Sequence, residues 1–140
     1  MRSTLAALLG GALLVNGILM IPAPETWFEL VPGAAESGPF NAHFVRDVGA
    51  IYLLGGLAFL WLTRSAKARG AALMAAGFLA LHALTHFGEV LASGHWSHLA
   101  RDVPGVYLPP ALALWLTLTH PRPKENRHAS VADRPLHRGL

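Results

Sequence analysis

The chain has 140 residues, of which 53% are hydrophobic and only 14% are charged, and it contains no cysteine. A soluble domain carries about 25% charged residues, so the composition argues against a soluble protein, and the lack of cysteine excludes disulfides and thiolate metal ligands in this chain. The net charge of +3 comes from short basic flanks around apolar segments, which is typical of membrane proteins and not of nucleic-acid binding. We therefore expect one all-α integral membrane domain with no nucleic-acid partner.

Four apolar segments are each close to the ~20 residues that cross a bilayer as a helix. They lie at about residues 4–21, 43–62, 71–92 and 103–118. They predict a four-helix transmembrane bundle over residues 1–120, followed by a disordered basic tail at residues 121–140. A cleaved signal peptide is an alternative for the first segment, although its exit, Pro22-Ala23-Pro24, is a poor cleavage site.

Charges in the connections predict the orientation. Basic residues lie at the N-terminus, in the connection between the second and third segments and in the tail: Arg2, Arg64, Lys67, Arg69, Arg122, Lys124, Arg127, Arg134 and Arg138. The connection between the third and fourth segments has only Arg101, next to Asp102. The loop of residues 22–41 has three acidic residues and no basic one. Because cytoplasmic loops are enriched in Lys and Arg, we expect a multi-pass protein of the bacterial inner membrane with both termini in the cytoplasm.

The loop of residues 22–41 is expected to be ordered. Residues 25–31 predict a short amphipathic helix at the membrane interface, where Trp27 and Phe28 suit the headgroup region. Asn41 is expected to cap the second membrane helix.

A charged motif occurs twice in the chain. The frame H-x-x-R-D-V-x-x-x-Y-L begins at His43 and again, with the same spacing throughout, 55 residues later at His98. Each copy opens an apolar segment, which suggests two duplicated helical hairpins related by an axis along the membrane normal. Small residues would let their helices approach closely: Gly10, Gly11, Gly17, Gly49, Gly55, Gly56 and Gly77.

The alternative is coincidence together with shared helix-start chemistry. Asp47 and Asp102 would then favour the positive end of a helix dipole. Arg46 and Arg101 would serve as structural ion pairs or lipid anchors. This interpretation needs no common ancestor of the two copies.

The third segment carries His82, His86 and Glu89 at spacings i, i+4 and i+7, which place them on one helix face. H-x3-H presents two imidazoles to one metal ion, and a carboxylate one turn on can be a third ligand. The rim residues that could complete the site are His43, Asp47, His98 and Asp102. Such ligands suit a divalent ion such as Zn(II), Cu(II), Fe(II) or Mn(II).

Other ligands remain open. A haem would need axial imidazoles from different helices. A quinone could use His82, His86, Tyr52 and Tyr107 as hydrogen-bond partners. The polar residues could also bond only to one another across helices, with Asn16 among the partners. Because the polar residues collect at the outer end of the helices, a continuous ion path is not expected.

Three stretches, at residues 27–33, 38–49 and 82–89, together resemble a group of small, uncharacterised proteobacterial inner-membrane proteins that are distantly similar to the DoxX-like proteins. The resemblance covers residues 5–118. It implies a four-helix bundle and a weak association with quinone-linked redox complexes, and it implies no catalytic residue.

These observations favour an accessory subunit that holds a metal ion or a redox ligand in a periplasm-facing His/Asp/Glu pocket. Its expected partners are the lipid bilayer and either other membrane subunits or further copies of itself. The first alternative is a structural or assembly subunit whose polar cluster only stabilises the bundle. The second is a small metal-dependent membrane oxidoreductase.

Overall fold

The computed structural model describes residues 1–121, and all regular structure in that range is helical. The elements in chain order are α1 (Arg2–Met20), α2 (Pro24–Leu30), α3 (Ala42–Leu62), the 3₁₀ turn η1 (Ala66–Ala68), α4 (Arg69–Ser93), α5 (Ser97–Asp102), the π-helical turn η2 (Val103–Tyr107) and α6 (Leu108–Thr119). The predicted tail lies, apart from Pro121, outside the described residues.

Three stretches are long and apolar enough to cross a membrane: Arg2–Met20, Ala42–Leu62 and Ala66–Ser93. They correspond to the first three predicted segments, with ends within a few residues of those expected. The all-α class is thus confirmed for residues 1–121.

The fourth segment is not the single regular helix that was predicted over residues 103–118. It begins with the π-helical turn η2, and α6 has only 12 residues, or about 18 Å, against a hydrocarbon core of about 30 Å. Pro104, Pro109 and Pro110 explain the interruption, because proline has no N–H for the helical hydrogen bond. The count of four membrane helices therefore stays a prediction.

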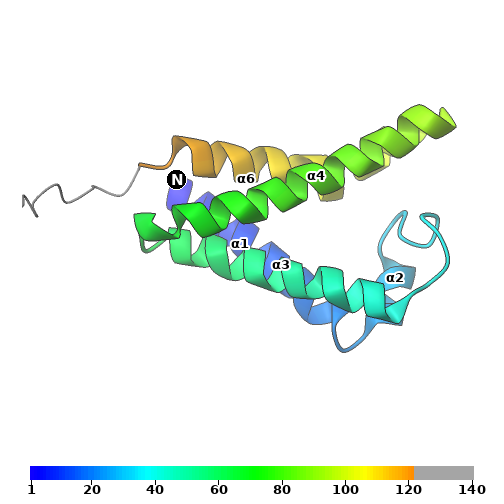
Figure 1. The fold of residues 1–140 in the computed structure, drawn as a ribbon, viewed down its shortest axis with the longest axis horizontal. Helices are drawn as coiled ribbons and strands as arrows, with labels where there is room; N and C mark the ends of the chain where they lie inside the picture. The colour runs from blue at the N-terminus through cyan, green and yellow to red at the C-terminus, as the bar shows by residue number, and fades with distance from the viewer. Residues whose placement is uncertain (122–140) are drawn as a thin grey trace, which may run out of the picture.

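The helices form two antiparallel pairs, α1 with α3 and α4 with α6 (Figure 1). In the first pair, Gly10 and Gly17 face Gly56 and Gly49. A Cβ atom on Gly17 would lie 2.6 Å from the carbonyl oxygen of Gly49, and one on Gly10 would lie 2.9 Å from that of Gly56. Glycine is needed here because the two backbones are almost in contact. By contrast, nothing lies within 4 Å of a Cβ on Gly11 or Gly77.

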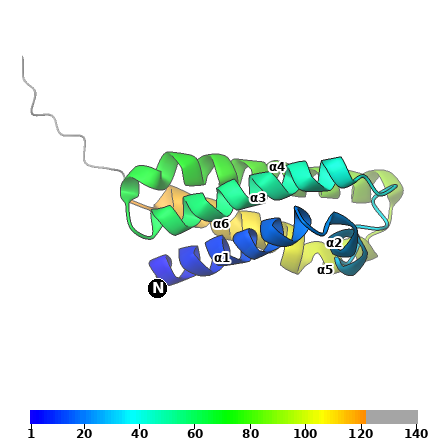
Figure 2. The same cartoon turned by 90° about the horizontal axis from the view of Figure 1, so that it is seen from below.

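The second pair uses alanine in place of glycine. Ala72 and Ala76 of α4 and Ala113 of α6 are completely buried. They belong to one apolar core with Phe59 and Leu116, which joins both pairs. Figure 2 shows α1, α3, α4 and α6 running alongside one another.

Much of the apolar surface stays uncovered. At most 39% of the most apolar window in each long helix is buried. Large side chains such as Leu8, Leu54, Met74 and Leu81 are exposed. Exposed apolar surface of this extent marks contact with a membrane or with another protein.

The two ends of the bundle differ. The basic end carries the N-terminus, η1 and the C-terminus of α6, and the polar end carries α2, α5 and the C-terminus of α4 (Figures 1 and 2). The predicted short helix is present as α2, and Asn41 caps α3 by accepting hydrogen bonds from the backbone N–H groups of His43 and Phe44. Toward the polar end α4 diverges from α3 (Figure 1).

Candidate functional site

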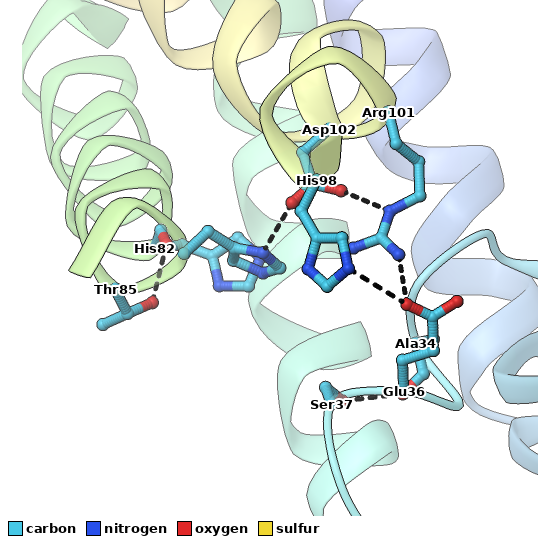
Figure 3. A network of polar contacts seen from close by, with 9 residues as sticks. Ala34, Glu36, Ser37, His82, Thr85, His98, Arg101 and Asp102 are labelled. Carbon is cyan, nitrogen blue, oxygen red and sulfur yellow. Dashed lines mark hydrogen bonds and ion pairs between the residues drawn. The ribbon is translucent and has the colours of Figure 1, made fainter. Parts of the chain in front are cut away.

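A polar cluster joins three separate segments at the polar end (Figure 3). Its members are His86 of α4, His98, Arg101 and Asp102 of α5, and Glu36 of the loop before α3. His86 Nδ1 lies 3.3 Å from Asp102 Oδ2, and Arg101 Nε donates to Asp102 Oδ1 at 2.8 Å. Arg101 also forms an ion pair with Glu36, and His98 Nε2 lies 3.8 Å from the same carboxylate.

Asp102 is the centre of this cluster. The residue is only 6% exposed, and a buried carboxylate is stable only when it is paired and hydrogen-bonded. Both of its oxygens have a partner, one from α4 and one from α5. The Arg101 guanidinium is charged throughout the physiological range, so it compensates the charge of the buried carboxylate.

His82 extends the cluster along α4. Its ring lies 4.7 Å from that of His86, measured between centroids, and stacks on Phe78 at 6.2 Å. The predicted common face of His82 and His86 is therefore present. Glu89 follows them on α4 and is exposed.

The predicted seven-residue metal site is not assembled. Among residues 1–121, no three His, Cys, Asp or Glu side chains are grouped so that they could hold one metal ion. His43 and Asp47 instead pair with each other at 3.4 Å, and their side chains are 88% and 62% exposed. The reason is that they lie one turn apart at the start of α3, at the end where α3 and α4 diverge.

The two copies of the charged motif do not have equivalent structures. The first copy begins the continuous helix α3, and Arg46 Nε donates to the carbonyl oxygen of Ile21 at 3.0 Å. The second copy covers α5 and η2, and Arg101 contacts two carboxylates. The two copies are thus similar in sequence but not in structure. The structure gives the predicted duplication no support.

The two tyrosines also differ. Tyr107 lies in η2, and its hydroxyl oxygen is buried without a hydrogen-bond partner among the described residues. Interruptions of this π-helical kind often occur at functional sites.

Tyr52 packs edge-on against Phe78, which separates it from His82. The cavity beside it has only about 10 Å³, which is barely the space of one water molecule. The structure therefore shows no room for a cofactor at Tyr52.

The sequence did not indicate two contacts, that of Glu36 with Arg101 and that of Trp27 with Asn16. Glu36 lies in a loop with no motif, but Gly33, with a φ of +86°, packs so closely on Arg101 that a Cβ there would be 2.7 Å from Cζ. Trp27 Nε1 donates to Asn16 Oδ1 at 2.6 Å, so Asn16 holds α2 and is not a partner of His82. An acidic residue between two glycines in a loop without basic residues was the one available signal for Glu36.

No family model matches the chain, and neither a curated protein nor a solved structure does. The resemblance to the DoxX-like proteins accordingly stays a prediction from the sequence. What the protein does has to be inferred from its polar cluster and its exposed apolar faces.

Proposed function

We propose that this protein is a multi-pass protein of the bacterial inner membrane with both termini in the cytoplasm. The three long apolar stretches and their uncovered faces support insertion. The basic end, with Arg64, Lys67 and Arg69 in its connection, would face the cytoplasm, and the polar end would face the periplasm. A fourth crossing would use α5, η2 and α6 together, over residues 97–119.

The protein's role in that membrane is to bind a small redox ligand of the quinone class at the polar end, as an accessory subunit of a larger complex. The observation that carries this proposal is the buried hydroxyl of Tyr107, which has no partner among residues 1–121. An unpaired buried hydroxyl costs about 1–3 kcal/mol, and a ligand carbonyl that accepts its hydrogen bond would remove that cost.

The arrangement of His86 suits the other half of such a ligand. Its Nδ1 faces Asp102, which favours the tautomer with the proton on that nitrogen. The Nε2 atom is then an acceptor and can bind the hydroxyl group of a reduced quinone. Asp102 would stabilise the imidazolium if a proton moved to His86.

The polar groups of this cluster suit a quinone better than the other ligands considered. A metal ion would need a third ligand beside His82 and His86, and none is grouped with them in residues 1–121. A haem would need a second axial ligand from another helix, because two histidines of one helix face cannot hold the same iron.

The test is a single substitution that spares the fold. In Tyr107→Phe, we expect affinity for a short-chain quinone, measured by calorimetry in mild detergent, to fall by about tenfold. Thermal stability should be unchanged or higher, because the lost hydroxyl had no partner. Tyr52→Phe is the matched control and should bind as the wild type does.

Equal affinity in Tyr107→Phe and the wild type would overturn the proposal. So would stoichiometric bound metal, measured by elemental mass spectrometry, in a preparation whose solvent extract contains no quinone. Tyr107→Phe should also lose any quinone that copurifies with the wild type.

A structural or assembly subunit is the second candidate, and one observation favours it. Asp102 links α4 to α5, and Arg101 links α5 to the loop of Glu36. If this is the only role of the cluster, the purified protein will bind neither quinone nor metal, and substitution of Asp102 will release its partner subunits together with its stability.

A further inference from the structure

A groove lies between α3 and α4 in the half of the molecule toward the basic end, whereas the polar cluster lies at the other end. It has a volume of about 460 Å³, within the usual range of ligand sites. Its lining residues are Leu54, Leu57, Ala58, Leu60, Trp61, Arg64 and Ala71. All of them except Arg64 are apolar or aromatic, and Leu54, Leu57 and Trp61 are more than half exposed.

Arg64 differs from the two other arginines at this end. Arg2 donates to the carbonyl oxygen of Thr119 at 3.0 Å, and Arg69 donates to that of Thr117 at 2.8 Å. Both therefore bind the exposed carbonyls at the end of α6. Within residues 1–121, the side chain of Arg64 makes no hydrogen bond or ion pair, and no acidic residue occurs between positions 48 and 88.

We infer that this groove binds an anionic phospholipid, with an acyl chain along the apolar lining and the phosphate on Arg64. A basic side chain beside an apolar groove is complementary to both parts of such a lipid. Trp61 lies one turn before Arg64, where an aromatic ring suits the interface. A free anion would leave the apolar lining unexplained, and a zwitterionic lipid offers less attraction to an unpaired cation.

This inference rests on the membrane location proposed above, but not on the quinone. Membrane location is checked first by fractionation of cells and carbonate extraction. Arg64→Gln should leave the quinone affinity unchanged, because Arg64 belongs to the other end of the bundle. Failure of the lipid site can therefore be told apart from failure of the ligand site.

The headgroup is tested by native mass spectrometry of the full chain with phosphatidylglycerol and phosphatidylethanolamine of identical acyl chains. We expect the wild type to retain phosphatidylglycerol about fivefold better, the effect typical of one basic residue near an anionic surface. Arg64→Gln should abolish this preference. Lys67→Gln, in the same connection but outside the groove lining, should keep it.

The groove itself is tested by filling it. Ala71 is exposed and lines the groove, so Ala71→Trp should displace both lipids, and Ala50→Trp, at an exposed position of α3 outside the groove, should displace neither. Should Ala71→Trp lower the thermal stability, Ala71→Leu provides the same test with less added volume. Equal retention of the two lipids by the wild type, or full retention after the groove is filled, would overturn the inference.

Discussion

Asp47 and Asp102 hold the same place in the two copies of the H-x-x-R-D-V motif, yet the side chain of Asp47 is 62% exposed and that of Asp102 is 5% exposed. Around Asp47 the motif is one turn of a straight helix, and its His and Asp pair with each other. Asp102 lies directly before the irregular turn η2 and contacts His86 of α4. The loop of Glu36 covers the neighbouring Arg101. The surroundings, and not the motif, decide which copy has a buried charge.

The two helix pairs differ in a related way. Glycines hold α1 and α3 so close that an added methyl group would meet backbone atoms. The pair of α4 and α6 has alanine at its buried contacts. In this pair Pro109 and Pro110 interrupt the hydrogen bonding at the start of α6. One pair is therefore suited to rigid packing, and the other carries an irregular backbone directly after the buried Asp102 of the polar cluster.

The largest difference between the two copies should come from their aspartates. Asp102→Ala leaves Arg101 and His86 without their buried partner, and breaking a buried ion pair costs about 3–5 kcal/mol. Asp47→Ala should cost no more than about 1 kcal/mol, because an exposed pair contributes little. Chemical denaturation in detergent micelles, followed by circular dichroism, measures both. Similar losses in the two variants would show that the burial of Asp102 has no energetic consequence.

The packing contrast is tested by two glycines of one helix. Gly17→Ala places a methyl group 2.6 Å from the carbonyl oxygen of Gly49, and overpacking of this kind costs about 1–3 kcal/mol. Gly11→Ala has nothing within 4 Å and should stabilise the helix by about 0.5–1 kcal/mol. The same denaturation assay compares them. A neutral Gly17→Ala would mean that α1 and α3 can separate at little cost.

Long apolar helices could be predicted because their signal is local. About 20 apolar residues in a row specify a helix whatever packs on it, and Asn41 shows that a cap can be read in the same way. The irregular start of the fourth segment could not be predicted in this way, because hydropathy does not register the loss of hydrogen bonds at Pro104, Pro109 and Pro110.

The site was harder to predict than the helices. Spacing on α4 correctly placed His82 beside His86, since periodicity fixes neighbours within one helix. It could not show that His43 and Asp47 pair with each other, or that Glu36 reaches Arg101, because both depend on how separate segments pack. The repeated motif predicted equivalent surroundings for Asp47 and Asp102. The two helix pairs pack differently, so the surroundings of the two residues differ.

The smallest expected effect concerns the loop that covers only the second copy. Glu36→Gln removes one partner of Arg101, but Glu36 is 61% exposed, so the free energy of unfolding should fall by no more than about 1 kcal/mol. The loop itself should respond more, because Glu36 makes its charged contacts with α5, to Arg101 and His98. Limited proteolysis within residues 31–41 should therefore be faster than in Glu29→Gln, an exposed substitution in α2. Equal rates in the two variants would show that Arg101 serves Asp102 alone, and the contrast between the two copies would then depend on α4 and not on the loop.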